Sequence, residues 1–185
     1  RLATAAAAAR AGDPRFVAAA ATVRAAAEAA VAIGPFSVMD KRIVPPSGDR
    51  HDYISIGPYW WPDPSRPDGL PYIRRDGIAN PENDALDRAS LERMVYGVTD
   101  LAWGWWLTGD EHFAARAALL LRVWFLDPAT RMNPHLRYGQ GVPGRCEGRG
   151  NGIIDTWTLP ELLDATRLLD GSSAWTAVDQ AGLSD

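Results

Sequence analysis

The sequence predicts an all-α protein made of antiparallel helix pairs, with short turns on one side and long aromatic loops on the other. The first 32 residues contain seventeen alanines, and alanine is the best helix former. Apolar residues recur at helical spacing over 91–105 and again over 113–124. No stretch shows a convincing alternation of apolar and polar residues, which would indicate half-buried strands.

The alanine-rich start is predicted to form two helices, over about 2–11 and 14–32. Asp13 is expected to cap the second helix, and Pro14 to occupy its first position. The apolar stripe of these helices is thin, so we expect them to lean on a partner surface.

Later helices have clearer boundary signals. Asn80, followed by proline, is a strong start signal, and the run 108–111 stops one helix and starts the next. Two amphipathic helices with so short a link are expected to form an αα-hairpin. A further helix is predicted over about 158–169, and Ser172 or Ser173 is expected to cap the last one.

We expect one domain with three regions. They are an alanine-rich helical lead-in over 1–34, an aromatic loop region over 35–80, and helix pairs over 81–185 with a second loop at 127–155. The sequence starts at Arg1 and ends at Asp185, soon after a helix start. We therefore expect a piece of a longer protein.

Composition and charge exclude several classes. Hydrophobic residues make up 46% and charged residues 23%, values typical of a globular protein rather than a disordered or collagen-like one. A net charge of −4 argues against a nucleic-acid partner, and no apolar run is long enough to predict a membrane helix. Cys146 is the sole cysteine, and the three histidines are far apart in sequence, so neither a metal nor a cofactor is predicted.

Tyr59, Trp60 and Trp61 form an aromatic cluster bordered by prolines. Aromatic faces stack on sugar rings while the indole N–H and phenol O–H reach hydroxyl groups, so this cluster is a candidate binding wall. The alternative is that the tryptophans pack beneath the loop as a small satellite core.

Arg74 and Arg75 are candidates for holding a carboxylate through a bidentate guanidinium. The commoner fate of such an arginine is a salt bridge, here with Asp68 or Asp76.

A dense polar cluster occupies the loop 131–140. Its candidate contacts are Asn133, His135, Tyr138 and Gln140. Histidine and tyrosine serve as general acids and bases, while amides and arginines neutralise an anion. The alternative is that Asn133 and His135 only tie the loop down.

Several strings carry a resemblance to a known family. They are DYIS (52–55), PYWWPDP (58–64), DGLPYIRRDG (68–77), LTGD (107–110), WFLDPATRMNPHL (124–136), YGQ (138–140) and GNGIIDT (150–156). Together they span about residues 36–175. The sequence resembles the alginate lyase family of polysaccharide lyases.

The resemblance implies an incomplete (α/α) toroid with a groove across one face. It implies metal-independent β-elimination of an alginate-like or glucuronan-like polymer, in the periplasm or outside the cell. The groove contacts implied are Tyr59, Trp60, Trp61, Arg75, Asn133, His135, Tyr138 and Gln140. The Asn-Asn-His motif and the later Arg…Tyr pair typical of the family are not found in these 185 residues. We therefore expect the main acid and base beyond Asp185.

Two other functions remain open. A glycoside hydrolase on the same toroid needs two carboxylates at the groove, one of them with a raised pKa. Its loop candidates are Asp63, Asp68, Asp76 and Glu147. A non-catalytic glycan-binding module explains the aromatic cluster without any acid or base.

Overall fold

The computed structural model describes residues 2–184, of which about half are helical. Arg1 and Asp185, on which the expected truncation rests, lie outside the described residues. The chain divides into two compact units, each assembled from segments far apart in sequence. Among the described residues, no helix is long and apolar enough to cross a membrane.

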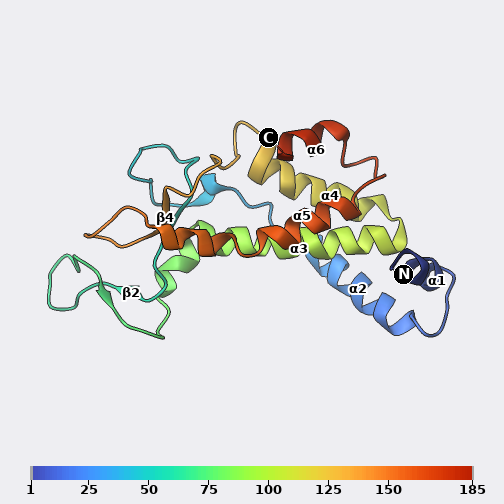
Figure 1. Ribbon diagram of the computed structural model, residues 1–185, viewed down its shortest axis with the longest axis horizontal. Helices are drawn as coiled ribbons and strands as arrows, with labels where there is room; N and C mark the ends of the chain where they lie inside the picture. The colour runs from blue at the N-terminus through green and yellow to red at the C-terminus, as the bar shows by residue number, and fades with distance from the viewer. Residues whose placement is uncertain (1, 185) are drawn as a thin grey trace. The chain divides into compact units, whose positions relative to one another are not determined.

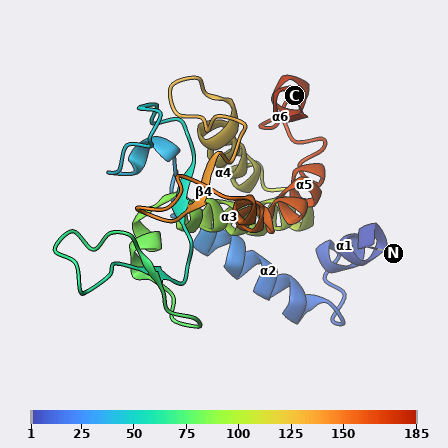
Figure 2. The ribbon, with the colours of Figure 1, turned by 60° about the vertical axis from the view of Figure 1, so that its left-hand side comes forward.

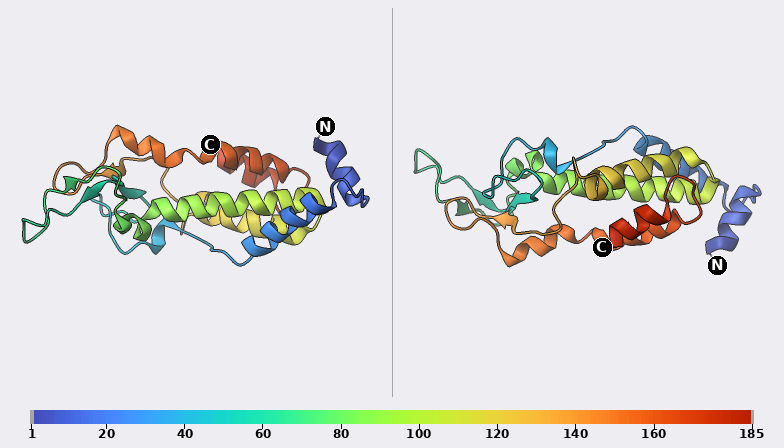
Figure 3. Two further views of the ribbon diagram at one scale, coloured as in Figure 1. Left: turned by 90° about the horizontal axis from the view of Figure 1, so that it is seen from below. Right: turned by 90° about the horizontal axis from the view of Figure 1, so that it is seen from above.

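The first unit is helical and comprises residues 2–35, 93–126 and 159–184. It contains α1 (Leu2–Arg10), α2 (Val17–Ala30), most of α3 (Asp87–Thr108), α4 (Glu111–Leu121), the π-helical turn η3 (Arg122–Leu126), α5 (Leu159–Leu168) and α6 (Ala177–Ser184) (Figure 1). Helix α4 runs antiparallel beside α3, which confirms the predicted αα-hairpin (Figure 3).

Two glycines of α3 let neighbouring helices approach closely. A Cβ atom on Gly104 would lie 2.4 Å from the Cβ of Ala27 and 3.2 Å from Cδ2 of Phe113. A Cβ atom on Gly97, seven residues earlier, would lie 2.2 Å from Cδ1 of Ile33. The missing side chains therefore allow α2 and α4 to pack against α3, so the alanine-rich lead-in gains the partner surface that it needs.

The helix-start signals were partly right. Asn80 caps as predicted, because its Oδ1 accepts a hydrogen bond from the Glu82 N–H at 3.0 Å, but the element that it starts is the 3₁₀ helix η2 (Pro81–Ala85). Helix α3 begins at Asp87. Asp110, in the predicted stop-and-restart run, caps α4 by accepting from the His112 N–H at 3.1 Å.

Two predicted caps were wrong. Helix α2 begins at Val17, because the carboxylate of Asp13 accepts from the Arg15 N–H and closes a local turn instead. Helix α6 begins after Thr176, which exchanges capping hydrogen bonds with Asp179. Ser172 and Ser173, the predicted caps, instead donate their hydroxyls to the carboxylate of Glu111 at the start of α4.

The second unit comprises residues 36–92 and 127–158 and is mostly irregular. It contains the 3₁₀ helices η1 (Val38–Asp40), η2 and η4 (Gly150–Thr156), and the strands β1 (Ile54–Ile56), β2 (Trp60–Trp61), β3 (Ile73–Arg74) and β4 (Tyr138–Gly141). Strand β1 pairs in parallel with β4, and β2 pairs antiparallel with β3 (Figure 2).

The absence of strands was therefore predicted wrongly: about half of the described residues are helical, and the regular structure also includes strands. Strands of two to four residues are too short to show an alternating pattern. Their partners are also remote in sequence: Ile54 lies opposite Tyr138, 84 residues further along the chain.

Candidate functional site

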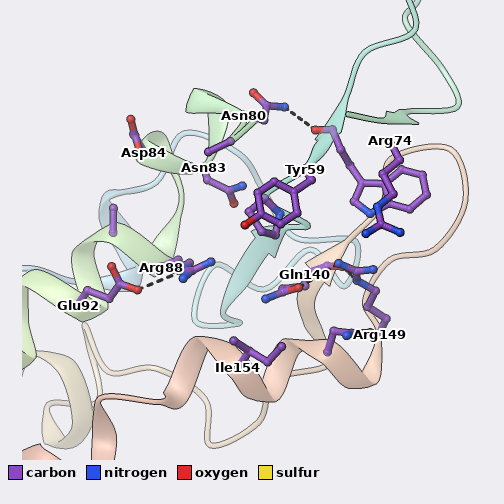
Figure 4. Close-up of a pocket in the computed structure, with 15 residues that line it drawn as sticks. Tyr59, Arg74, Asn80, Asn83, Asp84, Arg88, Glu92, Gln140, Arg149 and Ile154 are labelled. Carbon is purple, nitrogen blue, oxygen red and sulfur yellow. Dashed lines mark hydrogen bonds and ion pairs between the residues drawn. The ribbon is translucent and has the colours of Figure 1, made fainter. Parts of the chain in front are cut away.

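The second unit contains a cavity of about 700 Å³, within the range of about 300–1,000 Å³ that is usual for small-molecule sites. The residues that line it are Pro58, Tyr59, Trp60, Arg74, Ala79, Asn80, Asn83, Asp84, Arg88, Ala89, Glu92, Gln140, Arg149, Asn151 and Ile154 (Figure 4). They come from the β2–β3 hairpin, η2, the first turns of α3, β4 and η4. Three arginines, two carboxylates and four amides therefore surround one space.

Gln140 and Arg149 are held to each other at one side of the cavity. The Nη2 of Arg149 donates to Oε1 of Gln140 at 3.0 Å, and its Nε donates to the Gln140 carbonyl oxygen at 2.9 Å. Gln140 itself has a left-handed backbone with φ of 48°. Among the described residues, Arg149 forms no ion pair with a carboxylate, so its positive charge is not neutralised by the protein.

Arg88 and Glu92 occupy the opposite side, one turn apart on α3 (Figure 4). The Nε of Arg88 lies 3.1 Å from Oε1 of Glu92, and its Nη1 lies 3.7 Å from the buried carboxylate of Asp155. Arg74, near the mouth, pairs with the exposed Asp76 at 2.9 Å. Of the three arginines, Arg149 is therefore the one whose charge is available to an anion.

Asn83 presents an unused hydrogen-bond donor at the cavity wall. Its Oδ1 accepts from the Ile56 N–H at 3.1 Å. Its Nδ2 is buried and has no hydrogen-bond partner among residues 2–184. A buried donor without an acceptor costs free energy, so a ligand oxygen that satisfied it would be favoured.

The aromatic cluster divides between the cavity and its surroundings. Tyr59 is 40% exposed and stands inside the cavity (Figure 4), and Trp60 lines it as well. Trp61 lies outside the lining: its Nε1 donates to the Ile78 carbonyl oxygen at 2.8 Å, and the guanidinium of Arg75 covers its ring at 5.3 Å. The guanidinium of Arg145 also covers the Trp60 ring, at 5.3 Å, so Tyr59 is the aromatic face most open to a sugar.

Asn133 and His135 lie outside the cavity lining and bind a buried carboxylate instead. Asp52 is 4% exposed, and its Oδ1 lies 2.7 Å from Nδ2 of Asn133 and 3.0 Å from Nε2 of His135. Burial tends to raise the pKa of Asp52, but hydrogen bonds from Asn133 and Ser47 outweigh it and hold that pKa below its ordinary value. This geometry fits the loop-tying interpretation of both residues.

The predicted contacts therefore fall into two groups. The structure brings Tyr59, Trp60 and Gln140 together at the cavity. It places the other five outside the lining: Trp61, Arg75, Asn133, His135 and Tyr138. Tyr138 is buried beneath the ring of His135.

Sequence reasoning missed Asn83, Arg88 and Arg149. Asn83 and Arg88 follow the cap at Asn80, where polar residues are expected for helix-start reasons alone. Arg149 lies between two glycines in a stretch without periodicity. The one feature of the sequence that could have indicated a binding role for Arg149 is its place in a loop between Gly148 and Gly150.

The carboxylates that line the cavity are Asp84 and Glu92, not the four loop carboxylates predicted for a hydrolase. None of Asp63, Asp68, Asp76 and Glu147 lines the cavity, and hydrogen bonds from Ser65 lower the pKa of Asp63 rather than raising it. Within residues 2–184, no group of three or more His, Cys, Asp or Glu side chains is placed to hold a metal ion.

Comparisons with known proteins identify the family of the chain. The family model described as Alginate lyase matches residues 37–185, and the chain therefore belongs to that family. A crystal structure of an alginate lyase from Bacteroides ovatus is 48% identical to it, with a TM-score of 0.91. That match covers 98% of this chain and 49% of the other, so the chain spans about half the length of that protein. No curated protein matches the chain.

Proposed function

We propose that the protein is a lyase that cleaves a uronic-acid polymer, alginate-like or glucuronan-like, and that the cavity of the second unit forms part of its substrate groove. The observation that carries the proposal is Arg149, whose charge no carboxylate of the described chain neutralises, in one cavity with Tyr59 and Trp60. A sugar that bears a carboxylate offers a partner to each: an anion for the guanidinium and ring faces for the aromatics.

The chemistry of β-elimination explains why such a cavity is needed. The C5 proton of a uronate is weakly acidic until its carboxylate is neutralised. A base then takes that proton, the electron pair forms the C4–C5 double bond, and the C4–O4 bond breaks as an acid protonates O4. Arg149 and the free amide N–H of Asn83 are donors suited to the carboxylate. The acid and the base are not assigned to residues of this chain.

The proposal extends to architecture and location. The antiparallel packing of α2 and α4 on α3 supports part of an (α/α) toroid built from helix hairpins. A polymeric uronate is met outside the cytoplasm, so we propose a periplasmic or secreted protein with an acidic polysaccharide as its partner.

The test is an absorbance assay for the new C4–C5 double bond on a panel of polyuronates. It is run on residues 1–185 and on a longer polypeptide that contains them. We expect ultraviolet-absorbing product from the longer polypeptide. New reducing ends without absorbance would mean hydrolysis and would overturn the proposal. Binding without any product would favour the glycan-binding module.

A further inference from the structure

Asp155 is a charged residue with no exposed surface, directly behind the cavity wall. Three neutral donors converge on its carboxylate: the Tyr53 hydroxyl at 3.0 Å, the Ser55 hydroxyl at 2.5 Å and Nε2 of Gln140 at 2.8 Å. Arg88 lies further away, with Nη1 at 3.7 Å, and forms an ion pair with the carboxylate rather than a hydrogen bond. A carboxylate has about four lone-pair positions and no proton to donate, so three converging donors and a nearby guanidinium suit it and do not suit an amide.

This carboxylate determines how the amide of Gln140 is oriented. Because Nε2 of Gln140 donates to Asp155, Oε1 of the same amide points away from it and accepts from Nη2 of Arg149. A reversed amide would set its NH₂ group against the guanidinium, with two donors facing each other. Asp155 thus fixes the position of Arg149 through Gln140, although it does not itself line the cavity.

The backbone reinforces the same arrangement. The Ser55 hydroxyl that donates to Asp155 also accepts from the Gln140 N–H at 2.7 Å. That bond holds Gln140 in its left-handed conformation, an uncommon one for a residue other than glycine. Main chain and side chain of Gln140 are therefore both tied to one carboxylate.

We propose that Asp155 is a positioning residue that orients Gln140 and, through it, Arg149 to bind the carboxylate of a uronate in the cavity. This proposal rests on the proposed function, because it assigns Asp155 a role in the uronate-binding cavity. A buried charge without such a purpose is costly, and apolar residues of similar volume would often be as stable. Asp155 thus lies between Arg88, at 3.7 Å, and the Gln140 amide that holds Arg149.

A reciprocal exchange tests this role. Asp155→Asn removes the charge and, by adding an N–H donor, favours the reversed amide of Gln140. In the double variant D155N/Q140E, the amide introduced at position 155 donates to the carboxylate introduced at position 140, whose other oxygen accepts from Arg149. The net charge of this group of residues then equals that of the native protein. The variants are compared by the Kd for a uronate oligosaccharide, measured by calorimetry on the 185-residue chain.

We expect D155N to weaken binding about tenfold, the effect of one misplaced charge-assisted contact. The double variant restores the hydrogen bond to Arg149 but pairs its charge with the carboxylate introduced at position 140, so we expect it not to regain the lost affinity. Q140M breaks the link but keeps Asp155, and we expect the same loss from it if D155N folds poorly. In the longer polypeptide, D155N should raise KM more than it lowers kcat. A folded D155N with unchanged Kd, or a folded Q140M with unchanged Kd, would overturn the proposal.

A second readout separates this proposal from the proposed function. The Nη2–H signal of Arg149 in a ¹⁵N NMR spectrum reports its hydrogen bond to Oε1 of Gln140. We expect the signal to be lost in D155N and to return in D155N/Q140E, whatever the protein cleaves. If that pattern is seen and no uronate binds, the proposed function fails and the network stands. If the signal is unchanged in D155N, the positioning role fails.

Discussion

Different forces stabilise the interior of each compact unit. The first unit is called the helical unit below, and the second, which contains the cavity, is called the loop-rich unit. In the helical unit, α2 and α4 approach α3 at Gly97 and Gly104, and the contacts are between apolar side chains. In the loop-rich unit, buried carboxylates collect donors: Asp155 at the cavity, Asp52 at the 131–140 loop, and Asp87 beside Lys41. Apolar packing is indifferent to direction, whereas hydrogen bonds fix the orientation of each group. The unit that carries the cavity is the one whose interactions specify orientation.

The largest effect should come from removing the carboxylate at the centre of the loop-rich unit. Asp155→Ala leaves the donors of Tyr53, Ser55 and Gln140 buried without an acceptor. We expect the free energy of unfolding of this unit to fall by about 3–5 kcal/mol, measured by hydrogen exchange of its amides. A loss below about 1 kcal/mol would show that the polar network is not what stabilises this unit.

The helical unit should respond most to added volume. In Gly104→Val, the new Cβ would meet the Cβ of Ala27 at 2.4 Å, so α2 must move away from α3. We expect a destabilisation of about 1–3 kcal/mol by chemical denaturation. The control is Gly150→Ala, where a Cβ meets nothing within 4 Å. Equal effects of the two substitutions would contradict close helix packing.

The loop-rich unit should become more stable on mild acidification. Burial raises the pKa of Asp87 to about 6, although Lys41 at 3.1 Å opposes the shift. Folded Asp87 then takes up its proton at a higher pH than unfolded aspartate, so folding is favoured as the pH falls from about 6 towards 3.8. We expect a gain of at most about 3 kcal/mol, absent in Asp87→Asn. Stability that falls over this interval would contradict the assignment.

The stability of the helical unit should depend on pH in the opposite direction and should fall on acidification. Arg122, at 2.6 Å, and Thr176 hold the pKa of Asp179 below its ordinary value of 3.8. The stabilisation is therefore complete above that value and is lost as the pH falls below it. Asp179→Asn should cost about 0.5–1 kcal/mol at neutral pH and should flatten the acid limb of the unfolding curve. A variant with the native acid limb would show that this ion pair contributes nothing.

The smallest effect is expected at the exposed pair Arg74–Asp76, whose side chains are 61% and 74% exposed. Asp76→Asn should change the free energy of unfolding by less than about 0.5 kcal/mol. The same variant should leave Arg74 unpaired at the cavity mouth and strengthen binding of a uronate oligosaccharide slightly. A large loss of stability would mean that charge at the surface matters as much as charge in the interior.

The difference between the helical unit and the loop-rich unit also explains which features could be predicted from the sequence. Leu91, Val95, Val98 and Leu101 recur at helical spacing and are all buried, so α3 was evident, as was the cap at Asp110. These signals lie within a few residues of one another. The bonds of the loop-rich unit join residues far apart, as Tyr53 and Asp155 are 102 positions apart.

The candidate site was predicted only where residue type alone was informative. Tyr59, Trp60 and Gln140 were identified because aromatic and amide side chains suit a sugar, and the structure places them at the cavity. Asn83 and Arg149 were not, because their role depends on what surrounds them: one has a free N–H and the other an unneutralised charge. Such properties exist only once the chain has folded.

The most direct test of the central claim, that this cavity binds a uronate through its charge, compares two ligands on one protein. Binding of a uronate oligosaccharide and of its carboxyl-reduced, neutral counterpart is measured by calorimetry on the native chain and on Arg149→Met. We predict that the native chain prefers the charged ligand by about tenfold or more, that added salt weakens this preference, and that Arg149→Met abolishes it. Equal affinity for both ligands, or a preference that survives the loss of Arg149, would contradict the account.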